Sequence, residues 1–217
     1  MMESFQKLLG ETLIWVQFLA AIIALIYLPK LKNTYWKWFV AYIVLIFLIE
    51  AFSRWGLKNH ASYRVYWYDF FGIPVQFLFF YWLYAVKSLK NNQLFWVCTV
   101  VYILSFLPYF GLFEKVNIVY SLSYTVGNVL LMLLVLLELF KQIKSENILQ
   151  FKENFMFYVN VGIMIFYIGT LPFFSFYGLI LKDAVLWNDY FIFFMVANHV
   201  MYLLFTAAFI WGKPNTY

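Results

Sequence analysis

The stretch TLIWVQFLAAIIALIYLPKLK, residues 12–32, decides the fold of this chain. It has no charged residue between Thr12 and Leu28, and a helix needs roughly 20 apolar residues to cross the hydrocarbon core of a bilayer. Lys30 and Lys32 follow the apolar run directly, as in a stop-transfer sequence, whereas a signal peptide would end in a small-residue cleavage site. The stretch therefore predicts a first transmembrane helix that is retained in the protein.

Six further stretches of the same kind follow it. Hydrophobic residues make up 65% of the chain and charged residues 12%, against roughly 45–50% and 25% in soluble domains. Because backbone amides in lipid must be satisfied within their own helix, we predict an all-α, polytopic membrane helical bundle that forms one domain over residues 1–217. The predicted transmembrane helices are Thr12–Leu28, Tyr35–Ser53, Tyr66–Val86, Leu94–Phe113, Asn117–Phe140, Phe155–Leu181 and Asn188–Trp211.

The basic residues are unevenly divided between the two ends of these seven helices. Nine lie at one end: Lys30, Lys32, Lys37, Lys87, Lys90, Lys141, Lys144, Lys152 and Lys213. Six lie at the other: Lys7, Arg54, Lys58, Arg64, Lys115 and Lys182. The excess of Lys and Arg on the cytoplasmic side of membrane proteins predicts an N-terminus outside and a C-terminus in the cytoplasm. We expect a multi-pass protein of the cell inner (plasma) membrane, with the lipid bilayer as its surroundings and no nucleic-acid partner.

A few polar side chains are predicted to lie at membrane depth, where an acid costs roughly 2.5–3.5 kcal/mol at the bilayer centre. Tyr124 and Asn128 are four residues apart, as are Asn198 and Tyr202, so each pair shares a helix face. We expect such faces to converge on a cavity that opens to the outside and is closed by Phe, Leu and Met on the cytoplasmic half. The predicted ligand-binding residues are Glu50, Asp69, Gln76, Tyr124, Asn128, Asn198, His199 and Tyr202.

Structural explanations compete with this interpretation. Amides and hydroxyls between membrane helices commonly form interhelical hydrogen bonds, each contributing around 0.6 kcal/mol. Glu50 has Arg54 four residues away, and the two could pair at the helix end. For Glu138, which has Lys141 one turn away, we expect a solvated pair at the cytoplasmic end of its helix.

The sequence does not point to catalysis, to a metal or to a cofactor. Cys98 is the single cysteine and is expected to be an inert buried thiol, and zinc chemistry needs several His, Cys or acidic ligands together. Of the two histidines, His60 lies in a predicted loop and His199 stands alone in a helix. The predicted last helix, Asn188–Trp211, has no lysine for a retinal Schiff base, which excludes a rhodopsin-like function.

The chain resembles small seven-helix membrane proteins of the Bacteroidetes, which are similar to the membrane-sensor regions of histidine kinases. The resemblance rests on the Ile49–Glu50 end of the second helix, the tyrosine-rich segment Tyr63–Tyr68 and the late helix with Asn198. It implies a sensor- or receptor-like module that binds a small-molecule or lipid ligand and signals to a cytoplasmic or membrane protein partner.

Two other classes of function stay open. A small-solute transporter is favoured by the helix-breaking residues Gly72, Pro74, Pro108 and Pro172. An intramembrane hydrolase or transferase would need a nucleophile beside a base, such as Ser121 or Ser123 with His199 and Asp69.

Overall fold

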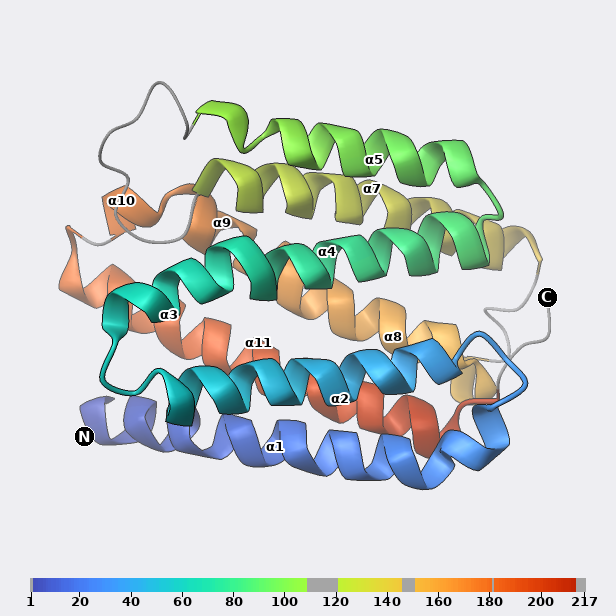
Figure 1. Ribbon diagram of the computed structural model, residues 1–217, viewed down its shortest axis with the longest axis horizontal. Coiled ribbons are helices and arrows are strands. Elements are labelled where there is room, and N and C mark those ends of the chain that lie inside the picture. Colours follow the sequence, from blue (N-terminus) through green and yellow to red (C-terminus); the bar gives the residue numbers. More distant parts are fainter. Residues whose placement is uncertain (1, 109–120, 146–150, 181, 214–217) are drawn as a thin grey trace.

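The helices of the computed structural model run antiparallel to one another in an elongated bundle (Figure 1). The structure describes residues 2–108, 121–145, 151–180 and 182–213. We call the end at which α1 and α11 begin the N-terminal end of the bundle, and the opposite end, where both finish, its C-terminal end. The helices are α1 (Met2–Leu31), α2 (Lys37–Ala51), α3 (Ala61–Trp67), α4 (Ile73–Tyr81), α5 (Asn92–Leu104), α7 (Ser121–Lys144), α8 (Phe155–Ile163), α9 (Gly169–Ser175), α10 (Tyr177–Ile180) and α11 (Ala184–Trp211).

Short π-helical segments join or extend several of these helices. η1 (Phe52–Gly56) continues α2, and η2 (Tyr68–Gly72) connects α3 to α4. η3 (Trp82–Ser88) extends α4, and η5 (Met164–Ile168) connects α8 to α9. Such segments widen the helix locally and are frequent at functional sites.

Within the described residues, six helices are long and apolar enough to cross a membrane, which confirms the prediction of a helical, apolar bundle to that extent. They are Phe5–Leu31, Lys37–Gly56, Ala61–Ser88, Leu122–Lys144, Phe155–Ser175 and Ala184–Trp211.

Three of the seven predicted helices extend into residues that the structure does not describe. The predicted helix Asn117–Phe140 corresponds to α7, and its first four residues, 117–120, lie outside the described residues. The predicted helix Leu94–Phe113 corresponds to α5, a shorter apolar helix, and its last five residues, 109–113, lie outside the described residues. The predicted helix Phe155–Leu181 ends earlier, at Ser175, and α10 follows as a separate turn. Residue 181 also lies outside the described residues.

Aromatic rings fill the C-terminal end of the bundle, where α2 and α8 begin and α11 finishes. Phe39 lies at the centre, with ring centroids 5.9 Å from Phe155, 5.2 Å from Phe205 and 5.6 Å from Phe209. Trp36 lies over Phe155 at 4.0 Å. All five side chains are buried, so this half of the bundle is closely packed. We call these five residues the aromatic seal.

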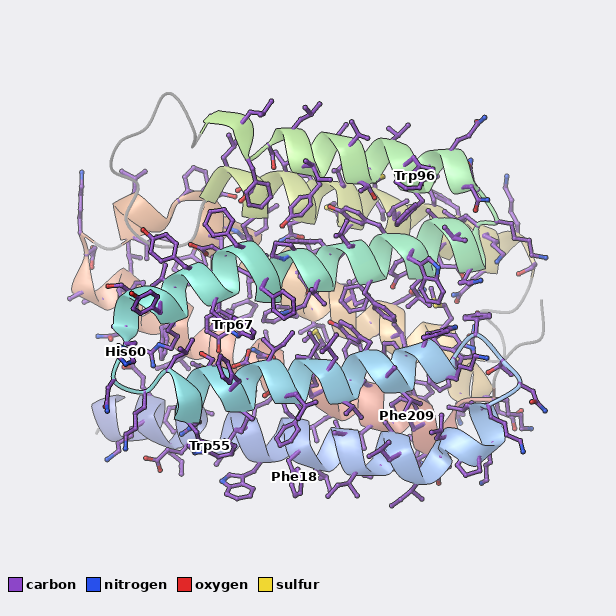
Figure 2. All side chains as sticks on the ribbon, in the orientation of Figure 1. Phe18, Trp55, His60, Trp67, Trp96 and Phe209 are labelled. Atoms are coloured by element: carbon purple, nitrogen blue, oxygen red, sulfur yellow. The ribbon has the colours of Figure 1, made fainter. Side chains whose placement is uncertain are left out.

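Large apolar side chains also cover the outside of the bundle. Trp15, Ile26 and Trp96 are each more than 60% exposed, and Phe18 extends outward from α1 (Figure 2). Soluble monomers rarely expose contiguous apolar patches larger than a few hundred Å². An outer surface of this kind is suited to contact with lipid.

Candidate ligand-binding cavity

A cavity of about 380 Å³ lies inside the bundle between α1, α2, the α3–η2–α4 helix, α7, the η5–α9 segment and α11. Its lining is mostly apolar and aromatic, and its volume falls within the roughly 300–1,000 Å³ typical of ligand pockets. The polar side chains that line it are Gln17, Glu50, Arg64, Tyr68, Asp69, Gln76, Tyr124, Tyr167, Asn198 and Tyr202.

The cavity continues toward the N-terminal end of the bundle. A second space of about 670 Å³ shares several of its lining residues, among them Gln17, Glu50 and Tyr68, and reaches Gly10 and Arg54. On the opposite side, the aromatic seal occupies the C-terminal half. A molecule would therefore reach the cavity from the N-terminal end.

Glu50 anchors the polar side of the cavity. Its Oε2 atom accepts a hydrogen bond of 2.5 Å from the hydroxyl of Tyr68, at the start of η2. Arg54 instead donates from Nη1 to the backbone oxygen of Gly10 at 2.8 Å. Within the described residues, Tyr68 and not Arg54 is thus the hydrogen-bond partner of Glu50, although Arg54 lies close enough to act on Glu50 through its charge.

Four oxygens in the cavity lining are buried without a hydrogen-bond partner in the described part of the chain. They are Oε1 of Gln17, Oδ1 of Asp69, Oδ1 of Asn198 and the hydroxyl of Tyr124. Their residues come from α1, η2, α11 and α7 and are 2%, 6%, 8% and 4% exposed, in that order. Buried polar groups are nearly always hydrogen-bonded in folded proteins, so these oxygens mark places where a ligand or water can bind.

The polar side chains on the wall between α4 and η5 are already hydrogen-bonded to each other. Tyr167 donates from its hydroxyl to Oε1 of Gln76 at 2.8 Å. The backbone oxygen of Tyr167 accepts a hydrogen bond of 2.5 Å from Nδ2 of Asn128. Tyr124 packs against Phe174 with ring centroids 3.9 Å apart. Apart from the Tyr124 hydroxyl, which has no hydrogen-bond partner in the described residues, this side offers an aromatic surface.

The structure brings six of the eight predicted ligand-binding residues to the cavity: Glu50, Asp69, Gln76, Tyr124, Asn198 and Tyr202. It does not bring Asn128 or His199 to the lining. Asn128 lies one turn beyond Tyr124 toward the C-terminal end, and its amide is held by η5. The ring of His199 lies 3.0 Å from Oγ1 of Thr12 and 2.7 Å from the backbone oxygen of Met195, so it joins α11 to α1.

The position of His199 follows from helix geometry. Successive residues of an α-helix are rotated by about 100°, so the side chains of Asn198 and His199 point in different directions. Asn198 faces the cavity, and His199 faces the contact with α1.

Sequence reasoning missed four polar lining residues: Gln17, Arg64, Tyr68 and Tyr167. Gln17 could have been predicted from the sequence, because it is the one amide side chain between Thr12 and Leu28. Tyr68 and Tyr167 could not have been predicted, since the chain has 18 tyrosines and the sequence alone does not distinguish tyrosines that line a cavity from tyrosines that pack in the core.

The expected solvated pair at Glu138 is wrong. Glu138 is only 2% exposed, and its carboxylate accepts hydrogen bonds from the hydroxyl of Ser88 and, at 3.0 Å, from Nε2 of Gln142. Asn154 donates to Oε1 of Gln142 at 3.2 Å, and Lys141 lies 3.8 Å from Glu138. These five residues form a buried network that links η3, α7 and the start of α8.

Within the described residues no group of three or more His, Cys, Asp or Glu side chains could hold a metal ion. The contact between His199 and Thr12 lies outside the cavity lining. Comparisons with protein-family models, with curated proteins and with solved structures give no match.

Proposed function

We propose that this chain is a receptor-like membrane module that takes a small or lipidic ligand into its cavity and passes the resulting change in helix packing to a partner protein. The observation that carries the proposal is a cavity reached from one end, lined by unpartnered oxygens and backed by the aromatic seal. In this proposal the chain crosses the inner membrane seven times, with the N-terminal end of the bundle outside.

Hydrogen bonds across the cavity supply a route for the signal. Tyr68 joins η2 to α2 through Glu50, and Tyr167 joins η5 to α4 through Gln76. A ligand that competes for Glu50 or Gln76 would release one helix from the other. Because η2 and η5 are π-helical, a return to regular α-helical winding would turn the segment beyond them.

A rotation of the helix segments beyond η2 and η5 would reach the network around Glu138 at the C-terminal end of the bundle. Ser88 and Glu138 couple the α4–η3 helix to α7, and Gln142 and Asn154 couple α7 to α8. Basic side chains surround this end, as the positive-inside rule requires of a cytoplasmic face. An acidic surface on the partner would complement them.

A small-solute transporter is the second candidate. Pro74 lies in the first turn of α4 and Pro172 lies inside α9, and both helices line the cavity. Helix breaks next to a central site are typical of transporters. Transport would require the aromatic seal to open, whereas a receptor needs only a change in helix packing.

The cavity can be tested with a filling variant. Met201 lines it and is 1% exposed, so Met201→Trp should fill the space, while Leu203→Trp adds the same ring on the outer surface, where Leu203 is 51% exposed. Mass spectrometry of the purified protein should find a bound small molecule or lipid in the parent and in Leu203→Trp, but not in Met201→Trp.

Two results would count against the receptor. Equal retention of the molecule by both variants would mean that it does not bind in the cavity. Uptake of that molecule into vesicles that carry the parent protein, lost in Met201→Trp, would favour the transporter.

A further inference from the structure

We infer that the ligand of this cavity is an organic ammonium: a primary amine, protonated and attached to an apolar or aromatic body. The inference rests on the proposed function, because it names the chemical class of the molecule that the cavity would bind. Three features of the cavity carry it: the type of its unpartnered atoms, the sign of its charges and its aromatic lining.

Three of the four unpartnered atoms are oxygens that only accept hydrogen bonds, and the fourth, the Tyr124 hydroxyl, can accept or donate. Oδ1 of Asp69, Oδ1 of Asn198 and Oε1 of Gln17 are buried, and a ligand complements them only if it donates hydrogens. Asp69 is decisive because both of its side-chain atoms are oxygens, whatever the orientation of the two amides. A primary ammonium has three N–H donors, one for each of the three oxygens that only accept.

The charges in the lining are predominantly negative. Glu50 and Asp69 are the acids, and Arg64 is the one base among the lining residues. Arg64 is exposed on α3 at the N-terminal end, and Arg54, in the adjoining space, donates to the backbone of Gly10. Removing an unpaired charge from water costs several kcal/mol. An ammonium beside Asp69 would supply the missing countercharge.

Aromatic rings surround the rest of the space. Phe173 lies between Trp187 and Phe194, with ring centroids 5.4 Å and 5.9 Å away, and all three line the cavity. Ring faces attract cations, and they also bury an apolar body. An anionic ligand would face two carboxylates, and a neutral one would leave the charge of Asp69 without a countercharge.

The test uses 2-phenylethylammonium as the probe, with propylbenzene as its uncharged isostere and 3-phenylpropionate as an anion of similar size. Binding to the purified full chain in phosphatidylcholine nanodiscs is measured by calorimetry. We expect the ammonium to bind at least roughly 10-fold more tightly than either analogue, the ratio that follows from hydrogen bonds to a charged group. Equal or tighter binding of propylbenzene or 3-phenylpropionate overturns the inference but leaves a ligand-binding cavity standing.

Variants locate the ammonium. Asp69→Asn should weaken its binding roughly 10- to 100-fold, and Asp69→Glu should restore part of the loss. Asp189→Asn is the matched control, because Asp189 is an exposed acid at the same end of the bundle and does not line the cavity. Equal losses in Asp69→Asn and Asp189→Asn would reduce the effect to general surface charge and overturn the inference. The thermal unfolding of each variant shows whether it is folded.

The ammonium could come from a soluble amine or from the headgroup of an aminolipid. Nanodiscs with phosphatidylethanolamine added separate the two sources, because a headgroup that enters the cavity would compete with the probe. If phosphatidylethanolamine weakens binding of the probe, the ligand is the lipid headgroup. If the affinity for the probe is unchanged, the ligand is a soluble amine. No heat from any of the three probes, in protein shown to be folded, overturns the inference. If Met201→Trp nevertheless loses a bound molecule that the parent retains, the proposed function stands although the ligand is not an ammonium.

Discussion

The hydroxyl of Tyr68 donates a hydrogen bond of 2.5 Å to Oε2 of Glu50. It joins the π-helical segment η2 to the last turn of α2, across 18 residues of sequence. The bond supplies a donor to a carboxylate that sits at the edge of an apolar space, and it fixes one wall of the cavity. Its loss should therefore be measurable in both stability and shape.

Tyr68→Phe removes this hydroxyl and leaves the ring in place. We expect the free energy of unfolding to fall by about 1–3 kcal/mol, because a hydrogen bond to a charged group is lost and the carboxylate stays half-buried. Unfolding by sodium dodecyl sulfate in mixed micelles measures the change. Tyr66→Phe is the control, since Tyr66 is exposed on the same helix. A loss in Tyr66→Phe as large as that in Tyr68→Phe would mean that the bond to Glu50 does not stabilise the fold.

The same chemical change should have opposite effects at the two buried acids Asp69 and Glu138. Glu138→Gln weakens bonds from Ser88 and Gln142 and the attraction to Lys141, so we expect a loss of about 1–3 kcal/mol. Asp69→Asn removes a carboxylate whose Oδ1 has no partner in the described structure, so the stability of the empty protein should stay the same or rise. The measurement is the unfolding free energy of each variant in detergent without added amine.

A marked loss of stability in Asp69→Asn would show that Asp69 already has a partner inside the folded protein. The cavity would then offer one acceptor fewer to a ligand. Stability unchanged in Glu138→Gln would mean that the network at the C-terminal end contributes little to holding α7 against η3.

The helices were predictable because hydrocarbon imposes a simple requirement on length and composition. Apolar runs such as Thr12–Leu28 and Asn188–Trp211 are nearly free of charge, and each corresponds to most of a long helix. Helix ends were less predictable. Lys7 and Glu11 are charged yet lie within α1, because a helix continues beyond the apolar region that defines it in the sequence.

The depth of the cavity residues in the membrane could be predicted from the sequence, but the direction of their side chains could not. The spacing of Asn198 and Tyr202 identified a polar face of α11, but it could not tell whether Asn198 or its neighbour His199 points inward. That choice depends on how α11 is rotated against α1, which is set by packing across the bundle. The prediction for Glu138 was wrong for the same reason, because its partner Ser88 comes from a helix 50 residues earlier in the sequence.

Gly127 should be intolerant of a side chain. A Cβ atom there would lie 2.8 Å from the ring of Phe77 and 2.9 Å from that of Tyr102, both buried. Gly127→Ala should lower the unfolding free energy by about 1–3 kcal/mol through overpacking, despite the better helix propensity of alanine. Gly10→Ala is the control, because nothing lies within 4 Å of its added Cβ and it should be neutral or stabilising. Similar values for the two variants in thermal unfolding would mean that α7 can move away from α4 at no cost.

Single-cysteine labelling tests the proposed seven-pass orientation. Cys98 is buried, so a Cys98→Ala background should fold and leave no thiol. Asn59→Cys and Asn33→Cys then place one thiol at each end of the bundle, at exposed positions next to α3 and α1. We expect a membrane-impermeant maleimide to label Asn59→Cys in intact cells, or in spheroplasts if an outer membrane is present, and Asn33→Cys only after lysis.

Two further positions extend this test along the chain. Ser145→Cys and Lys182→Cys are exposed, and they follow α7 and precede α11. Because the helices alternate in direction, Lys182→Cys should behave like Asn59→Cys, and Ser145→Cys like Asn33→Cys. The reverse pattern at all four positions would invert the orientation and turn the mouth of the cavity toward the cytoplasm. If Asn59→Cys and Lys182→Cys were labelled from opposite sides, an odd number of crossings would separate them, and α5 would not cross the membrane.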